Sequence, residues 1–329
     1  MVAIASYACH FPQAAVTAET LRTALGAAPR GLTRKRVAGP DEDALTLALA
    51  AARDLPLDDI PRGMALASMS LPYARRVQAG LLVDGLGLAG AGAFISEHTT
   101  SARAGTEALT LHAALTEGWG GRSVVVAAEA ARGHAGAGAD ARLGAGAAAL
   151  LLAPSGGVAS LLGSEHYAAE DPGLAFSLAG EQARRDVEVP GYAAAAYQRA
   201  IGGAVDALLP ALDADLARFR FVVLDVDDPR LIAKALGPAG LQDQQWRPVW
   251  PYPQTGELGA AGALVGLCVA LDGAAAGDWI LVLSYGGGSA ADAIAFEAGH
   301  EAGGRGVEAA VQGGVEVDFA AYLKLMEVI

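Results

Sequence analysis

The chain carries one programme of secondary structure twice, and this duplication restricts the folds open to it. Over 104–152 a helix begins at a turn of small residues, and an apolar strand, a glycine-rich segment and a second apolar strand follow. Over 259–296 the same order recurs, with a strand at 279–284 and its partner at 292–296. Continuous apolar strands that alternate with helices indicate sheets buried on both faces. The pattern predicts an α/β fold of two similar halves that share a layered core.

The composition favours a large core in one compact unit. The 329 residues are 53% hydrophobic and include 43 glycines, which allow tight turns and close packing. We find no linker between the halves. We therefore expect an N-terminal half at 1–155 and a C-terminal half at 156–329 that form a single unit.

Hydrophobic periodicity predicts further elements outside the repeat. The expected elements are strands at 2–7, 64–70 and 219–225 and helices at 42–55, 192–209 and 229–236. The segment 300–314 is rich in glycine and alanine, so we expect a loose loop there.

Charge and cysteine content exclude several classes of protein. A formal net charge of −13 argues against binding to nucleic acid or to an anionic membrane surface. Cys9 and Cys268 cannot make a disulfide framework, and no cysteine–histidine cluster has zinc-ligand spacing. The start at Met1 lacks the basic region of a signal peptide, and the apolar stretch at 145–153 is too short to cross a bilayer. We expect a soluble cytoplasmic protein without a bound metal.

Several short motifs resemble those of one known family. They occur in a consistent order, at 39–43 (GPDED), 70–74 (SLPYA), 104–106 (AGT), 277–289 (GDWILVLSYGGGS) and 317–322 (VDFAAY). In this order and spacing they resemble hydroxymethylglutaryl-CoA synthase of the archaeal and bacterial type, within the thiolase superfamily. The likeness extends over nearly the whole chain.

This resemblance implies a fold, a ligand and partners. The expected fold is thiolase-like, with two duplicated α/β halves in a five-layered αβαβα arrangement, and the expected assembly is a dimer. A tunnel would bring the pantetheine arm of a coenzyme A thioester to a buried site. Relatives acylate a cysteine and use a histidine, an asparagine and a glutamate, and some act beside a thiolase subunit and a small OB-fold protein.

The positions that match the family's catalytic residues carry different residues here. They are Ala102 for the cysteine, Met69 for the glutamate, Asp225 for the histidine, Gln254 or Glu257 for the asparagine, and Gln198 for a lysine. A Claisen-type condensation needs a thiolate, whose pKa a helix N-terminus lowers. Alanine at position 102 therefore predicts a protein that binds an acyl thioester without being acylated at this position.

Ser101 is a candidate substitute for the missing cysteine. A serine nucleophile needs a base within hydrogen-bond reach, and His98 is close in sequence. The alternative is that Thr99, Thr100 and Ser101 cap the following helix, and we favour this interpretation because the hydroxyls directly precede it. Glu257 is a second candidate substitute.

Other polar segments have a structural and a functional interpretation. By resemblance, Arg103 and the turn at Gly286, Gly287 and Gly288 would contact the substrate. The 286–288 turn does not open a helix, so it is not a P-loop. The acids at 225–228 fit the start of a helix better than a metal site. The loop at 132–138 is expected to be mobile, with Arg132 within reach of a CoA phosphate.

Three functional hypotheses follow. The first is a catalytically degenerate synthase-like subunit of an acyl-CoA-processing complex, either a homodimer or a heteromer with a cysteine-bearing thiolase-like subunit. The second is an active acyltransferase or thioester hydrolase that uses Ser101, Asp225 or Glu257. The third is an acyl-CoA binder without enzymatic activity. We expect no bound cofactor, with the coenzyme A thioester as the ligand.

Overall fold

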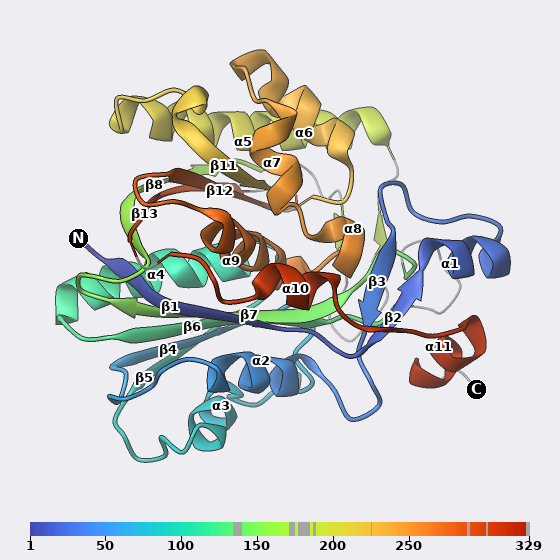
Figure 1. Cartoon of the computed structure of the whole chain (residues 1–329), viewed down its shortest axis with the longest axis horizontal. Helices are drawn as coiled ribbons and strands as arrows, with labels where there is room; N and C mark the ends of the chain where they lie inside the picture. Colours follow the sequence, from blue (N-terminus) through green and yellow to red (C-terminus); the bar gives the residue numbers. More distant parts are fainter. Residues whose placement is uncertain are drawn as a thin grey trace.

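The computed structural model describes residues 1–133, 140–170, 175–176, 185–186, 189–224, 226–287, 290–300 and 302–326. Among them, nine strands form one continuous hydrogen-bonded order, β11-β12-β13-β8-β1-β7-β6-β4-β5. This order bends into two sheets, because β1 and β8 pair only at Ala3 and Ile4 (Figure 1). None of the helices in the described part of the chain combines the length and apolar character that a bilayer crossing requires.

The two sheets and three helical layers alternate (Figure 1). The first sheet contains β1 (Ala3–His10), β7 (Ala145–Ala153), β6 (Ser123–Ala130), β4 (Gly63–Ala67) and β5 (Phe94–His98). The second contains β8 (Ala159–Ala168), β13 (Ala290–Ala298), β12 (Trp279–Gly286) and β11 (Phe219–Leu224). The central helices are α4 (Ala104–Trp119) and α9 (Gly262–Gly273), and the outer helices are α2 (Ala44–Arg53) and α3 (Ala79–Gly85) on one side and α5 (Pro190–Ala211), α6 (Pro229–Leu236) and α7 (Asp243–Trp246) on the other. The arrangement confirms the expected five layers.

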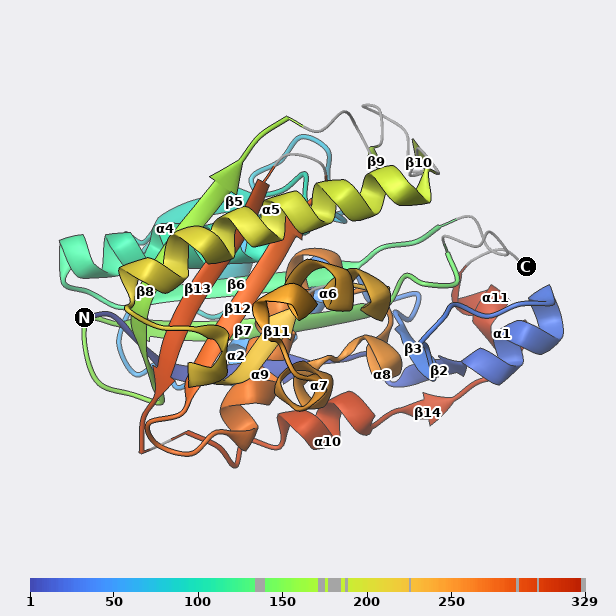
Figure 2. The ribbon, with the colours of Figure 1, turned by 90° about the horizontal axis from the view of Figure 1, so that it is seen from above.

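The central layer explains why α9 is apolar on every side. All residues from Gly262 to Leu271 are buried, because the helix contacts both sheets and α4. The outer helix α2 instead buries one face, and Asp43 and Thr46 form a capping box at its start. On the opposite side, α5 lies across β8, β13 and β12 (Figure 2). Periodicity therefore found these helices correctly.

Several expected elements have other bounds, and several strands were not predicted, among them β8 of the second sheet. The strand expected at 64–70 ends at Ala67, and the strand expected at 2–7 continues to His10. We did not predict β8, because most of its residues are only partly buried and several are polar. The expected loop at 300–314 contains a short helix, α10 (Val307–Gln312), which covers α9 with Val307 and Val311.

A third, small sheet joins distant parts of the chain. It contains β14 (Val315–Glu316), β2 (Ala14–Thr17) and β3 (Arg34–Val37), flanked by α1 (Ala18–Leu25) and α11 (Phe319–Leu325) (Figure 2). Lys35 is buried in it and donates to the Tyr322 hydroxyl at 3.0 Å and to the Asp140 carbonyl at 2.7 Å. The remaining elements are β9 (Ala175–Phe176), β10 (Arg185–Asp186), α8 (Tyr252–Thr255) and the 3-10 turns η1 (Leu216–Arg218), η2 (Gly237–Ala239), η3 (Arg247–Val249) and η4 (Gly259–Ala261).

Candidate functional site

One edge of the first sheet gathers the segments that carry the predicted site. The strands β4, β5 and β6 run parallel, and Ala67 is in register with both His98 and Ala127. Parallel strands end at the same edge, so residues 68–70, 98–102 and 129–130 lie beside one another there. The contact from the Ser68 backbone N–H to the His98 carbonyl, at 3.0 Å, ties the first two segments together.

Ala102, which motif register matched to the family's nucleophile, lies just before α4. The residue is partly buried and has only a methyl group to offer. One turn later, a Cβ on Gly105 would lie 2.2 Å from the Ala260 carbonyl oxygen, so only glycine allows this close approach of α4 to η4. The start of α4 is thus pressed against a segment from the second half of the chain.

Ser101 does not cap the helix that follows it. The N-cap of α4 is Arg103, which makes no side-chain capping bond, so the prediction that Thr99, Thr100 and Ser101 cap the helix is wrong. A backbone hydrogen bond forms the turn before the helix instead: the Ala104 N–H donates to the Ser101 carbonyl at 3.0 Å. His98 Nε2 contacts Ser96 Oγ at 3.1 Å, and none of the hydrogen bonds between described residues uses the Ser101 hydroxyl.

Met69, which motif register matched to the family's glutamate, is 46% exposed. Its side chain offers no carboxylate, but its backbone N–H donates to Glu129 Oε1 at 2.6 Å. Of the two alternatives for the asparagine position, Gln254 accepts from Arg34 Nε at 2.9 Å, so its amide is bound to β3. Glu257 lies in a bridge with Leu143 and is close enough to Glu129 to raise the pKa of that carboxyl.

Asp225 and Gly288 lie outside the described residues. Next to Asp225, Asp227 pairs with Arg142 Nε at 3.3 Å, and Asp228 accepts from the Arg230 N–H as the N-cap of α6. The acids of 227–228 therefore serve an ion pair and a helix start, as we expected for this segment. Gln198, at the position of a family lysine, is exposed on α5.

Arg103 and the glycine turn lie against each other. A Cβ on Gly286 would lie 3.1 Å from Ser101 Oγ and 3.2 Å from Arg103 Cβ. The Arg103 guanidinium is held by the fully buried Asp292, with Nη1 3.0 Å from Oδ1. Thr106 Oγ1 and His166 Nδ1 also contact this carboxylate, at 2.6 and 2.7 Å. Arg103 is thus a fixed cation beside the turn.

The loop expected to be mobile at 132–138 is described only in part. Arg132 donates to the Gly39 carbonyl, and 134–139 lie outside the described residues.

Glu129 is the functional candidate that sequence reasoning missed. This carboxyl is buried and accepts hydrogen bonds from the Met69 N–H, the Ser70 hydroxyl and the Ala260 N–H. Burial raises its pKa to about 7, although these three hydrogen bonds oppose the shift. An acid at the end of an otherwise apolar strand was the available signal. Its partners lie 60, 59 and 131 positions away, so no local motif points to it.

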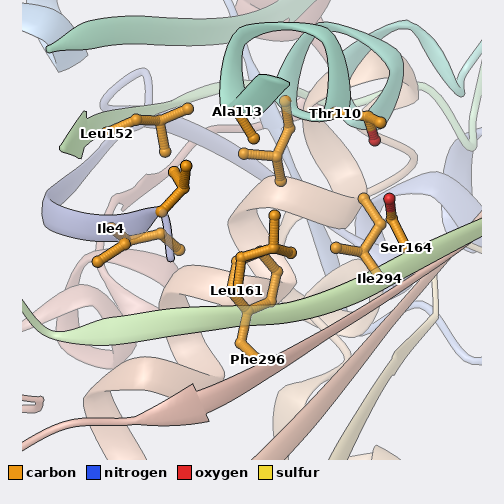
Figure 3. Close-up of a pocket in the computed structure, with 11 residues that line it drawn as sticks. Ile4, Thr110, Ala113, Leu152, Leu161, Ser164, Ile294 and Phe296 are labelled. Carbon is orange, nitrogen blue, oxygen red and sulfur yellow. The ribbon is translucent and has the colours of Figure 1, made fainter. Parts of the chain in front are cut away.

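A separate apolar cavity lies at the other end of the sheets (Figure 3). Ile4 is in register with Leu152, which pairs with Ser123 at the start of β6, whereas Glu129 lies near its end. The labelled side chains converge from α4, β1, β7, β8 and β13, with the hydroxyls of Thr110 and Ser164 among apolar groups (Figure 3). The Thr110 hydroxyl is buried without a hydrogen-bond partner. This cavity is therefore separate from the sheet edge at Met69 and Ala102.

The layered core, with the start of α4 at the sheet edge, defines a thiolase-like fold. No protein-family model matches the chain. It is 27% identical to hydroxymethylglutaryl-CoA synthase of Pyrobaculum neutrophilum over 352 residues, which cover 100% of this chain and 98% of that protein. The chain is thus similar along its whole length to hydroxymethylglutaryl-CoA synthases, which confirms the resemblance of its motifs.

Solved structures share the fold. The crystal structure of an HMG-CoA synthase complexed with CoA superposes with a TM-score of 0.86 at 19% identity, covering 98% of this chain and 89% of that one. The HMG synthase of the curacin biosynthetic pathway, in complex with its acetyl donor acyl carrier protein, gives a TM-score of 0.87 at 18% identity, covering 99% and 88%.

Proposed function

We propose that this chain is a catalytically degenerate hydroxymethylglutaryl-CoA synthase-like subunit that acts on CoA thioesters within a larger acyl-transferring complex. The complex would form or cleave a carbon–carbon bond, with the chemistry at a cysteine of its partner. The observation that carries the proposal is the methyl group of Ala102 at the start of α4, where the family has its nucleophile.

The loss of a thiol removes the covalent step of condensation. Without the thiolate, donors that remain in such a pocket give only modest residual catalysis. The replacements at the other matching positions act in the same direction, since Met69 has no carboxylate and the Gln254 amide is bound to Arg34. Ser101 does not compensate, because its hydroxyl has no base among the described residues.

The preserved frame supports a CoA thioester as the ligand. Gly105 still allows α4 to touch η4, and Gly286 still allows β12 to approach Ser101 and Arg103. A solved structure of this fold is complexed with CoA, and another with an acyl carrier protein. We therefore assign the ligand to the class of pantetheine thioesters, held at the edge of the first sheet.

The partner surface is the free edge at β5. This strand ends the order of the nine-stranded sheet, so its outer backbone groups are open to pairing. Phe94 is 47% exposed and forms an edge-to-face pair with Trp119, and Leu111 is exposed on α4. An apolar patch next to an open strand is typical of a protein interface. A second copy or a cysteine-bearing thiolase-like subunit would cover it, with a small OB-fold protein as an additional member.

Affinity capture of the tagged full chain from its native host, followed by mass spectrometry, tests the proposal. We expect stoichiometric recovery of a cysteine-bearing thiolase homologue, and carbon–carbon bond formation or cleavage on a CoA thioester only when this partner is present. Condensation of acetyl-CoA with acetoacetyl-CoA by the purified chain, at rates typical of condensing enzymes, would contradict degeneracy. Thioester binding by the chain without any partner would instead identify a binding protein.

A further inference from the structure

We propose that Ser70 is a nucleophilic serine with Glu129 as its base, and that it accepts acyl groups from thioesters. This inference goes beyond a degenerate condensing subunit, because it places a second reactive group at the same sheet edge. Only the choice of a thioester as the natural acyl donor rests on the proposed function.

The contact between the two side chains is short and oriented. Ser70 Oγ donates to Glu129 Oε2 at 2.6 Å, and the Ala130 N–H donates to the same Oγ at 3.0 Å. The Ser70 N–H donates to Ser68 Oγ, also at 3.0 Å, which holds the backbone of the turn. With its proton directed at a carboxylate, Ser70 Oγ has one lone pair left, which only the Ser68 hydroxyl approaches, at a long 3.4 Å. An electrophile would have to displace this weak contact.

Glu129 is a suitable base at neutral pH. Its Oε1 is occupied by the Met69 and Ala260 N–H groups, which leaves Oε2 for the serine proton. Burial brings the pKa of this carboxyl to about 7, and Glu257 is the described charged group that adds to the shift. A base is most effective when its pKa is close to the working pH.

The position of Ser70 allows access from solvent. Ser70 and Leu71 are partly buried, whereas Met69 before them and Pro72 after them are exposed. The turn lies beside the segment that leads to Ala102, because β4 and β5 end together. An acyl thioester held at this edge would therefore have its carbonyl near the Ser70 hydroxyl.

Another serine of the first sheet also contacts a potential base. Ser96 Oγ lies 2.8 Å from His112 Nε2 and 3.1 Å from His98 Nε2. Burial lowers the pKa of His112 to about 4 and also lowers the pKa of His98. These imidazoles are weak bases at neutral pH, so Ser96 is the poorer nucleophile and serves as an internal comparison.

The step balances without another reactant. Ser70 Oγ attacks the thioester carbonyl, the Oγ–C bond forms and the C–S bond breaks. The serine proton passes to Glu129 and then to the leaving thiolate, which gives acyl-Ser70 and a free thiol. Water can hydrolyse this ester by the same route, with Glu129 taking and returning the proton. A purely structural Glu129 would hold β4 against η4 and give none of this reactivity.

An active-site serine probe tests the proposal without CoA or a partner. The intact chain is treated with a fluorophosphonate, which loses fluoride on attack by a serine, and the adduct is mapped by peptide mass spectrometry. We expect one adduct, on Ser70, at a rate that rises from pH 6 to pH 8 as Glu129 loses its proton. Glu129→Gln should lower the rate at least about tenfold, as expected for a lost general base, and Ser96→Ala should leave it unchanged.

Two results would overturn the proposal: an absent adduct, or an adduct on Ser96 or Ser101. A rate independent of both pH and Glu129→Gln would also exclude Glu129 as the base. If Ser70→Ala fails to fold, Ser70→Cys replaces it, and rapid alkylation by iodoacetamide that slows with Glu129→Gln would support the pair. Because the probe needs neither thioester nor partner, failure here leaves the proposed function standing, and failure of that function leaves this result standing.

Discussion

The Ala260 N–H donates to Glu129 Oε1 at 3.2 Å, so a carboxyl of the first sheet is bonded to the turn that begins α9. The same oxygen accepts from the Met69 N–H. One buried carboxyl thus connects the segment of Met69 to the turn before α9, which belongs to the second half of the chain.

Glu129→Gln should remove part of the pH dependence of stability. The pKa of this carboxyl is about 7 in the folded chain, above its ordinary value of 4.5. A raised carboxyl pKa means that the folded state holds the proton more tightly, so stability falls as pH rises from about 4.5 to above 7. A shift of this size corresponds to about 3 kcal/mol. Urea unfolding at pH 5 and pH 8 gives the free energy of unfolding of both chains. We expect this free energy to fall less between pH 5 and pH 8 in the variant than in the native chain. An equal fall in both would contradict the assignment.

Ala102→Cys should give a reactive thiol. The start of α4 places backbone N–H groups and the helix dipole near this position, which lowers a thiol pKa. We expect alkylation by iodoacetamide at pH 7 about tenfold faster than at Cys9. Cys268, which is fully buried and whose pKa is raised by that burial, is the internal control and should stay unmodified. Equal rates at the introduced thiol and Cys9 would show that the helix start no longer activates a thiol.

Gly105→Ala should destabilise the chain, while Gly118→Ala on the same helix should not. A Cβ at Gly105 would lie 2.2 Å from the Ala260 carbonyl oxygen, whereas one at Gly118 meets nothing within 4 Å. We expect a loss of about 3 kcal/mol at the first position. At the second, we expect a gain of up to about 1 kcal/mol from helix propensity. Thermal unfolding compares the two, and equal melting temperatures would mean that α4 and η4 do not touch.

Thr110→Val should stabilise the chain, while Thr106→Val should destabilise it. The Thr110 hydroxyl is buried beside the apolar cavity without a partner, so its removal relieves a desolvation cost of about 1 kcal/mol (Figure 3). Thr106 Oγ1 donates to buried Asp292, so its loss should cost about 2 kcal/mol. Denaturant midpoints measure both changes. A lower midpoint for Thr110→Val would indicate a bound water in the cavity.

Phe94→Arg should weaken association, while Phe176→Arg should leave it intact. Both rings are exposed, but Phe94 lies on the free edge strand β5 beside Trp119, and Phe176 lies on the short strand β9. A charge in an apolar interface is costly when it is desolvated. Light scattering after size-exclusion chromatography measures the assembly. Unchanged assembly in Phe94→Arg would place the interface elsewhere.

Sequence reasoning recovered the fold but only part of the site. A continuous apolar run such as that of α9 identifies the central layer, because a helix that is apolar on every side must be buried on every side. The strand β8 was missed because its partly buried, polar residues break the pattern. Motif register assigned Ala102 and Met69 to catalytic positions of the family, and the parallel strands bring both segments to one edge.

Long-range contacts account for the rest of the site. The Ser70–Glu129 contact joins residues 59 positions apart, and the motif at 70–74 that contains Ser70 does not point to Glu129. The capping prediction for Ser101 failed because Arg103 begins the helix with backbone contacts alone. Hydroxyls before a helix favour a cap, but the chain enters α4 through Thr100 with a φ of 80°, which sets a different path.

The buried lysine of the small sheet has a consequence for biosynthesis. Lys35 relies on Tyr322, which lies 287 positions later in the chain, and β2 gains its neighbour β14 from a similarly late segment. During translation, β2 and β3 leave the ribosome long before β14 and α11 are made. Until then Lys35 lacks the Tyr322 hydroxyl, and β2 has one edge without a neighbouring strand. We expect this chain to depend on chaperones while it is made. Ribosome-bound chains that stop before Val315 should be sensitive to protease at 35–37, which are buried in the finished protein.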